Sequence, residues 1–342
     1  MTSQPPEFPW PPASATGAGS MPGTDPQHAA RLVFDELPDL PYLPELPARG
    51  VGADMIGRTL ALLVDMPAET IPTGWRLSAR PGRDSHRARA LLGQDLDVLE
   101  EVADGYQGPL KVQVAGPWTL AASLELPGSL DAAVGDPGAV ADLIASLAEG
   151  LAAHVADVSR RVPGATVLLQ LDEPSLPAVL AGGIASASGL RRMRAIEPGP
   201  AADALRAVRE PAGADTIVHC CAAHVPYGII AQSGARAVGM DLSLLRREEE
   251  DQLAEIADAG TGIVAGILTP LHPVRSSPKD LAGRVVELCN HLGLPPSRAT
   301  AQVVLAPACG LAGVSPERAG QLLADCREAA RILPEVMDEG AR

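Results

Sequence analysis

Residues 165–173, with the sequence ATVLLQLDE, decide the fold expected for this chain. The segment is a near-continuous apolar run that ends in two carboxylates. Runs of this kind are typical of strands buried on both faces, as in a parallel sheet. Residues 139–161, just before it, have the apolar spacing of an amphipathic helix. The pair therefore predicts alternating helices and strands, the pattern of an α/β fold.

The same alternation recurs along the chain. Further strands are predicted at residues 110–116, 216–219, 235–240, 262–266 and 302–306, with weaker candidates at 15–19 and 50–53. Amphipathic helical stretches are predicted at residues 201–210, 248–259 and 281–292. Eight strands in about 300 residues predict a single (β/α)8 TIM-type barrel. A doubly wound sheet is the alternative, but no GxGxxG or GxxxxGK[ST] motif follows an early strand.

Composition narrows the classes of function. The Pro/Ser-rich residues 1–14 predict a disordered tail, and residues 15–342 a single catalytic barrel. The formal net charge of -15, without a Lys/Arg cluster among aromatics, argues against nucleic acid as a partner. There is no run of eighteen apolar residues and no basic-then-apolar N-terminus, so no membrane is expected and the cytoplasm is the predicted location.

Polar residues end several of the predicted strands. Asp172 ends the quoted strand, His219 ends the next, Asp241 follows residues 235–240, and Cys309 lies three residues past 302–306. In a barrel the C-terminal ends of all strands meet at one face, where active sites lie. We therefore expect these side chains to converge.

The chain has five cysteines, and an odd number without an export signal predicts reduced thiols. Cys289 and Cys326 lie in helical patterns and are expected in the core. Cys220 should point away from its neighbour Cys221 if the strand pleat continues there.

His219 and Cys221 form a His-x-Cys motif, and Cys309 adds a second thiol from a distant part of the chain. One imidazole and two thiolates are a ligand set suited to Zn²⁺, and three protein ligands with an open position are typical of catalytic zinc. The alternative for His219 is a strand-end histidine that only forms hydrogen bonds.

Five short motifs follow one another along the chain: AGSMPG at 18–23, AGPWTL at 115–120, QLDEPSL at 170–176, HCC at 219–221 and ACGL at 308–311. In this order they resemble the Ile-Gly-Ser-Phe-Pro, Gly-Pro-Val-Thr-Ile, Gln-Ile-Asp-Glu-Pro-Ala-Leu, His-x-Cys and Asp-Cys-Gly-Leu motifs of cobalamin-independent methionine synthase. The chain is similar to the C-terminal catalytic barrel of that family, within the superfamily that includes uroporphyrinogen decarboxylase. The resemblance extends over residues 16–333.

The resemblance implies transfer of a methyl group to the thiol of homocysteine, which forms methionine. It implies that Gly19 and Ser20 hold the substrate carboxylate and that Asp172 receives the ammonium. The zinc ligands it implies are His219, Cys221 and Cys309. A free thiol has a pKa near 8.5, and binding to zinc leaves it deprotonated at neutral pH.

The chain departs from the family pattern at several positions. The family's third zinc position is a glutamate, where this chain has the shorter Asp241, which either ligates the metal or leaves that place to water. His272 corresponds loosely to a family histidine and could relay a proton to the leaving nitrogen. A family glutamate that shares the ammonium falls near Arg49, and the tryptophan that packs on the folate pterin falls at Ala122.

The methyl donor is therefore left open between methyltetrahydrofolate and a methylated corrinoid protein. Two other functions compete with this one: a zinc-dependent alkyltransferase that acts on another thiol, and a non-catalytic zinc-binding barrel. Asp172 in its motif favours an amino-acid substrate. Uroporphyrinogen decarboxylase chemistry fits less well, because it uses no metal and needs an arginine-rich site.

Overall fold

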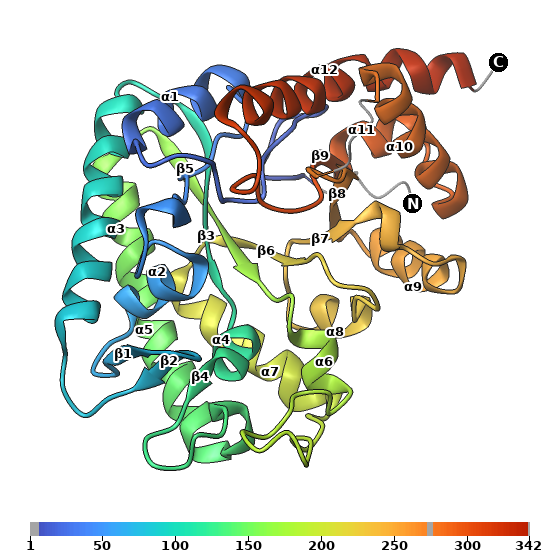
Figure 1. Cartoon of the computed structure of the whole chain (residues 1–342). Coiled ribbons are helices and arrows are strands. Elements are labelled where there is room, and N and C mark those ends of the chain that lie inside the picture. Colours follow the sequence, from blue (N-terminus) through green and yellow to red (C-terminus); the bar gives the residue numbers. More distant parts are fainter. Residues whose placement is uncertain (1–6, 272–275, 341–342) are drawn as a thin grey trace.

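A computed structural model describes residues 7–271 and 276–340 and shows an α/β fold (Figure 1). Its centre is a curled parallel sheet of six strands in the order β3-β5-β6-β7-β8-β9, surrounded by helices. The six stronger strand predictions are confirmed. The strands are β3 (Gly108–Ala115), β5 (Ala165–Asp172), β6 (Asp215–Cys220), β7 (Ala237–Asp241), β8 (Gly262–Leu268) and β9 (Val303–Pro307).

The helices pack their apolar sides on the outer face of this sheet and on each other. They are α1 (Pro26–Glu36), α2 (Met55–Leu62), α3 (Arg83–Val102), α4 (Pro117–Ser123), α5 (Pro137–Arg161), α6 (Leu176–Leu180), α7 (Pro198–Arg209), α8 (Tyr227–Gln232), α9 (Arg247–Asp258), α10 (Pro278–Leu292), α11 (Pro296–Gln302) and α12 (Pro316–Gly340). Short 3-10 turns are η1 (Pro47–Arg49), η2 (Ala133–Gly135), η3 (Glu210–Ala212) and η4 (Leu242–Leu244). The predicted helical stretches coincide with α5, α7, α9 and α10.

A second, small sheet contacts α3 through β1 and was not predicted. It contains β1 (Ala68–Ile71), β2 (Gly74–Leu77) and β4 (Leu124–Glu125), in the order β1-β2-β4. These strands have at most four residues, so they carry too short a pattern to be detected in the sequence.

The two weaker strand predictions were wrong as regular strands. Residues 50–53 form a turn, and residues 15–19 form only an isolated bridge to β9. Two irregular segments instead lie between the edges of the sheet. Residues 14–16 bond to β9 and residues 41–43 bond to β3, and the backbone of Glu45 bonds to residues 19 and 21. In the described part of the chain, the central sheet thus has six regular strands rather than the eight expected for a (β/α)8 barrel.

The N-terminal end of the sheet is closed by residues that were predicted to be disordered. Trp10 is only 4% exposed, and its indole donates to the carbonyl of Ala301 at 3.1 Å. It packs on a small apolar cluster formed by Leu40, Leu168, Ile217, Ala237, Val264, Val304 and Ala306. Residues 7–14 therefore belong to the packed body, and the predicted tail was too long at this end.

Helix α5 is long and apolar enough to span a membrane by length and composition. Its apolar residues Leu143, Leu147 and Leu151 are fully buried, and the helix packs on β5 and α7. Its hydropathy is therefore explained by its position in the helical layer around the sheet.

Candidate functional site

Strand register brings the predicted site residues to one level. Asp172, the last residue of β5, is paired with His219 of β6, which is paired with Gly239 of β7. Cys221 follows β6 directly, and Cys309 lies two residues after the end of β9. The strand ends that carry these residues therefore lie side by side at one edge of the sheet.

Cys221 and Cys309 meet across the site, although they are far apart in the sequence. Their thiols lie close enough for each to shift the pKa of the other. The hydrogen bond from Cys221, helped by the backbone N–H of Gly310, lowers the pKa of Cys309 to about 6 against the effects of burial and of Asp241. The same contact and burial raise the pKa of Cys221. The pair therefore favours a thiolate on Cys309, which is the more exposed of the two.

The imidazole of His219 is 7% exposed and lies against Gly239. A Cβ at Gly239 would be 2.7 Å from its Nδ1, so the absence of a side chain there makes room for the ring. Burial and the charge of Lys111 lower the pKa of His219 to about 4. The ring is consequently neutral at pH 7, the state in which histidine binds metals.

The donor chemistry fits zinc, but a complete metal site is not assembled. Within residues 7–271 and 276–340, no group of three His, Cys, Asp or Glu side chains is close enough to hold an ion. The Asp241 side chain turns to η4, where its Oδ1 accepts hydrogen bonds from the N–H of Ser243 at 2.9 Å and from the Ser243 hydroxyl at 2.6 Å. His272 lies outside the described residues. Zinc stays a prediction.

The other cysteines lie as expected. Cys220 is fully buried in the core shared with the helices, away from Cys221. Cys289 in α10 and Cys326 in α12 are also fully buried.

The turn at residues 18–20 is held between the sheet and the Cys309 motif. The N–H of Leu311 donates to the Ser20 carbonyl at 2.7 Å, and Gly310 has no side chain that would overlap the Ser20 hydroxyl. Gln170 donates to the Ala18 carbonyl at 2.7 Å. The first, third and fifth sequence motifs are thus in direct contact.

Glu173 connects the second and third motifs. This fully buried carboxylate accepts from the N–H of Trp118 at 2.9 Å and from the N–H and hydroxyl of Thr119 at 2.7 and 2.8 Å. Gly116 leaves the space that the carboxylate fills. Burial raises the pKa of Glu173 to about 7 against these hydrogen bonds. Its role here is to hold the start of α4 against the end of β5.

Three buried polar residues around Asp172 were missed in the sequence. They are Glu45, Lys111 and Gln113, all at most 4% exposed. Lys111 lies close enough to Asp172 and Glu45 for their charges to raise its pKa, although burial lowers it overall to about 8. A signal was present: Lys111 and Gln113 occupy alternate positions of an otherwise apolar strand, which places both on the inner face.

Glu45 is backed by a chain of buried charges. Arg58 approaches it at 3.9 Å between Nε and Oε1 and forms an ion pair with Asp95, which also pairs with Arg49. Arg58 and Asp95 are 4% and 3% exposed. Arg49, the position near which the family carboxylate was expected, thus lies outside the Asp172 cluster and contacts it only through Asp95 and Arg58.

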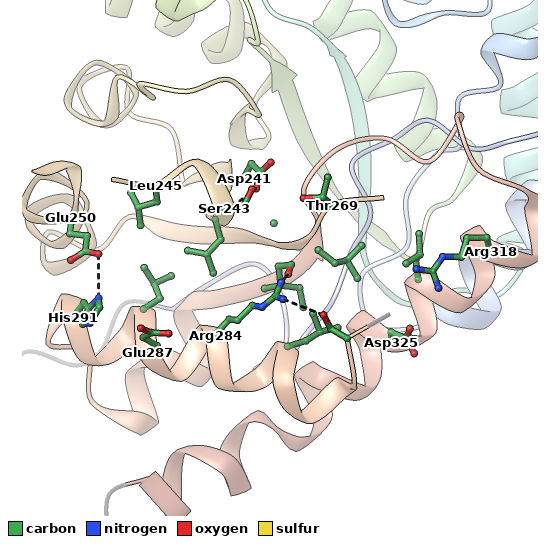
Figure 2. A pocket seen from close by; sticks show the side chains of 18 residues that line it. Asp241, Ser243, Leu245, Glu250, Thr269, Arg284, Glu287, His291, Arg318 and Asp325 are labelled. Atoms are coloured by element: carbon green, nitrogen blue, oxygen red, sulfur yellow. Dashed lines mark hydrogen bonds and ion pairs between the residues drawn. The ribbon is translucent and has the colours of Figure 1, made fainter. Parts of the chain in front are cut away.

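A cavity of about 430 Å³ opens beside Asp241, between β8, α10 and α12 (Figure 2). Arg284 lies along its floor and donates to the Ile267 carbonyl at 2.8 Å and to the Ser276 hydroxyl at 3.2 Å. Arg318 lies at its α12 side. Among the predicted site residues, Asp241 alone lines this cavity in the described part of the chain.

Neither a protein-family model nor a curated protein sequence matches this chain. Among solved structures, a B12-independent methionine synthase from Shewanella sp. W3-18-1 in complex with selenomethionine superposes with a TM-score of 0.63 at 11% identity, over 97% of this chain and 100% of that one. An Amycolatopsis orientalis BexX/CysO complex and a mutant Pyrococcus furiosus tryptophan synthase α-subunit superpose less well, with TM-scores of 0.40 and 0.39 at 11% and 12% identity. They cover 97% and 96% of this chain and 93% and 98% of their own. The chain thus shares its fold with the methionine synthase.

Proposed function

We propose that this protein is a zinc-dependent methyltransferase that converts homocysteine to methionine. The observation that carries the proposal is the thiol pair of Cys221 and Cys309, formed beside a neutral imidazole at His219 and a buried carboxylate at Asp172. Thiols, imidazole and an amino-acid anchor at one end of the strands suit thiol chemistry better than hydrolysis or decarboxylation.

His219, Cys221 and Cys309 would hold the zinc ion, with Asp241 or water in the fourth place. When bound, zinc supplies a substrate thiolate at neutral pH. Asp172 would bind the substrate ammonium and the Gly19–Ser20 turn its carboxylate, which orients the sulfur.

In the reaction, the substrate sulfur forms a bond to the methyl carbon while the bond from that carbon to its donor atom breaks. If the donor is methyltetrahydrofolate, the leaving nitrogen takes up a proton, and His272 is the proposed relay. If the donor is a methylated corrinoid protein, the bonding electrons stay on the cobalt. The likeness in fold to a methionine synthase solved with selenomethionine supports this class of substrate.

The first experiment measures zinc and its ligands. We expect about one zinc per chain, and loss of zinc without loss of fold in Cys309→Ser and His219→Ala, while Cys220→Ala keeps the metal. X-ray absorption should show a new sulfur neighbour when homocysteine is added. A zinc site already complete with protein ligands and unchanged by homocysteine would favour a non-catalytic zinc barrel.

The second experiment measures methionine formed from homocysteine with methyltetrahydrofolate or methylcobalamin as donor. Product from one of them identifies the donor class. If homocysteine binds zinc but neither donor reacts, the alternative of an alkyltransferase with another methyl or alkyl source gains support.

The reduced thiol pair suits a reducing compartment, so we propose the cytoplasm as the site of action.

A further inference from the structure

Two surface segments meet beyond the C-terminal ends of β3 and β5. Residues 126–132 form a loop after β3 and α4, and residues 184–193 form a hairpin after β5 and α6, closed by backbone hydrogen bonds between its arms. The N–H of Ala187 in the hairpin donates to Oδ1 of Asp131 in the loop at 2.8 Å. The loop and the hairpin therefore form one surface, at the edge of the molecule near α4 and α6 (Figure 1).

A recess of about 420 Å³ lies between this surface and the β1–β2 hairpin. Its lining is mainly apolar and includes Trp75, Leu130 and Ile184. Two carboxylates also line it, Asp54 and Glu125, and both accept hydrogen bonds from neighbouring residues of the chain. The recess therefore suits an apolar group better than a charged one.

Two leucines at this surface are exposed. Leu190 is 88% exposed, and Leu130, at the recess, is 54% exposed. The backbone of Leu130 has a φ of 61°, a left-handed conformation that leucine rarely adopts. Folding alone favours neither an apolar side chain in water nor this conformation, so both features point to contact with another molecule.

The hairpin is also basic. Arg191, Arg192 and Arg194 are exposed, and residues 184–196 contain no carboxylate. Within residues 7–271 and 276–340, none of the three arginines forms an ion pair, and Arg192 donates only to a backbone carbonyl. In a chain with a net charge of -15, this group of positive charges favours an acidic partner.

The chemistry of the surface favours a protein over the other anionic partners. A nucleic acid would need exposed aromatic rings for its bases, but Trp75 is only 7% exposed, and phosphates gain nothing from exposed leucines. A second copy of the chain is disfavoured by the net charge. In a two-fold dimer, the arginines of one copy would also face those of the other.

We propose that the 126–132 loop and the 184–193 hairpin, extended to Arg194, form a docking surface for an acidic protein that inserts an apolar side chain into the recess. An apolar pocket beside arginines is typical of the central part of protein–protein interfaces. The partner binds at the same end of the strands as the candidate site. The proposal is independent of zinc and of methyl transfer, because none of these residues has a role in the proposed reaction.

The test measures the binding of defined polymers to the full chain by fluorescence anisotropy at low salt. Labelled poly(Glu,Tyr) is an acidic polypeptide with aromatic anchors, poly-L-glutamate has the charge without the anchors, and oligo(dT) represents nucleic acid. We expect poly(Glu,Tyr) to bind about tenfold or more tightly than the other two, and its binding to weaken as salt is added.

Two variants separate the contributions of charge and of apolar contact. Arg191→Gln combined with Arg194→Gln should weaken the binding of poly(Glu,Tyr) about tenfold. Leu130→Asn should weaken it to a similar extent but leave poly-L-glutamate unchanged, and asparagine tolerates the left-handed backbone at this position. The substituted side chains are exposed, so the circular dichroism should stay the same.

Arg246→Gln combined with Arg247→Gln is the matched control. These two arginines are also exposed and follow an exposed leucine, Leu244, but residues 248–251 behind them are all acidic. This control should bind poly(Glu,Tyr) as the unaltered chain does.

Four results would overturn the docking surface: equal weakening in the control, equal binding of poly-L-glutamate, tighter binding of oligo(dT), or no binding of any polymer. Sedimentation of the chain alone tests the remaining occupant. A dimer that the Arg191 and Arg194 substitutions dissociate would assign the surface to a second copy and overturn the proposal, whereas a monomer agrees with it.

Discussion

Asp95 in α3 contributes to the stability of the fold and also pairs with Arg58, which lies beside Glu45 of the candidate site. It is 3% exposed and accepts from Arg49 and Arg58, and Arg58 in turn lies 3.9 Å from Glu45. Asp95→Asn removes the charge but keeps the shape, and leaves the buried guanidinium of Arg58 without its ionic partner. Breaking a buried pair in this way costs about 3–5 kcal/mol.

Asp97 in the same helix provides a matched control. It also pairs with an arginine, Arg161, but its side chain is 72% exposed. Exposed pairs contribute roughly 0–1 kcal/mol, so Asp97→Asn should be nearly neutral. Urea unfolding at pH 7 measures both. If the two variants lose the same stability, Asp95 does not hold a buried charge network, and the support we assign to Glu45 is wrong.

Three further outcomes follow from single residues. Burial lowers the pKa of His154 to about 4, so the unfolded chain binds the proton first and stability falls as pH drops from about 6.5 toward 4, by up to about 3 kcal/mol. Urea unfolding at pH 7.5 and 4.5 measures this loss, which His154→Leu should lessen and a substitution of the exposed His86, His86→Leu, should leave unchanged. If both variants lose the same unfolding free energy between the two pH values, His154 is not the source of the pH dependence. Trp10→Ala should lower the unfolding free energy by about 3–5 kcal/mol in the same assay, and a neutral result would mean that residues 7–14 do not close the sheet. Gly239→Ala should displace the His219 imidazole and weaken zinc binding in a metal titration while the circular dichroism stays unchanged; undiminished zinc affinity would remove His219 from the ligand set.

The strands of the central sheet could be predicted because they are buried on both faces. A short, near-continuous apolar run such as residues 165–171 is typical of a fully buried strand, and the polar residues that follow it mark the edge of the sheet. Residues 41–45 could not be found in this way, because the four prolines in 38–47 mask an extended segment that makes only a few backbone bonds. The buried Trp10 was missed because it lies, with Phe8, in a Pro-rich stretch that has no helix or strand pattern.

Site residues could be predicted where a residue type suited to the chemistry stands at the end of a predicted strand. Cys221 and Cys309 were found from their residue type at strand ends, and they do meet. Glu45 was not found, since it comes from an irregular segment whose place beside β3 depends on tertiary hydrogen bonds. Asp241 was expected at the metal, but the free N–H groups at the start of η4 compete for its carboxylate.

The side chains on the inner face of the sheet differ in size and polarity from strand to strand, and this difference determines where a ligand can bind. Strands β3, β5 and β6 present long polar side chains inward, such as Lys111, Gln113 and His219, whereas β7 presents Ala237 and Gly239. The polar half therefore extends across the interior into space that the small residues leave. Trp10 packs on the apolar cluster at the N-terminal end of the sheet, so these polar side chains lie toward the end at which Cys221 and Cys309 meet. Under the proposed function, an amino acid with its ammonium at Asp172 would place its sulfur toward the thiol pair, which is the arrangement that methyl transfer to sulfur requires.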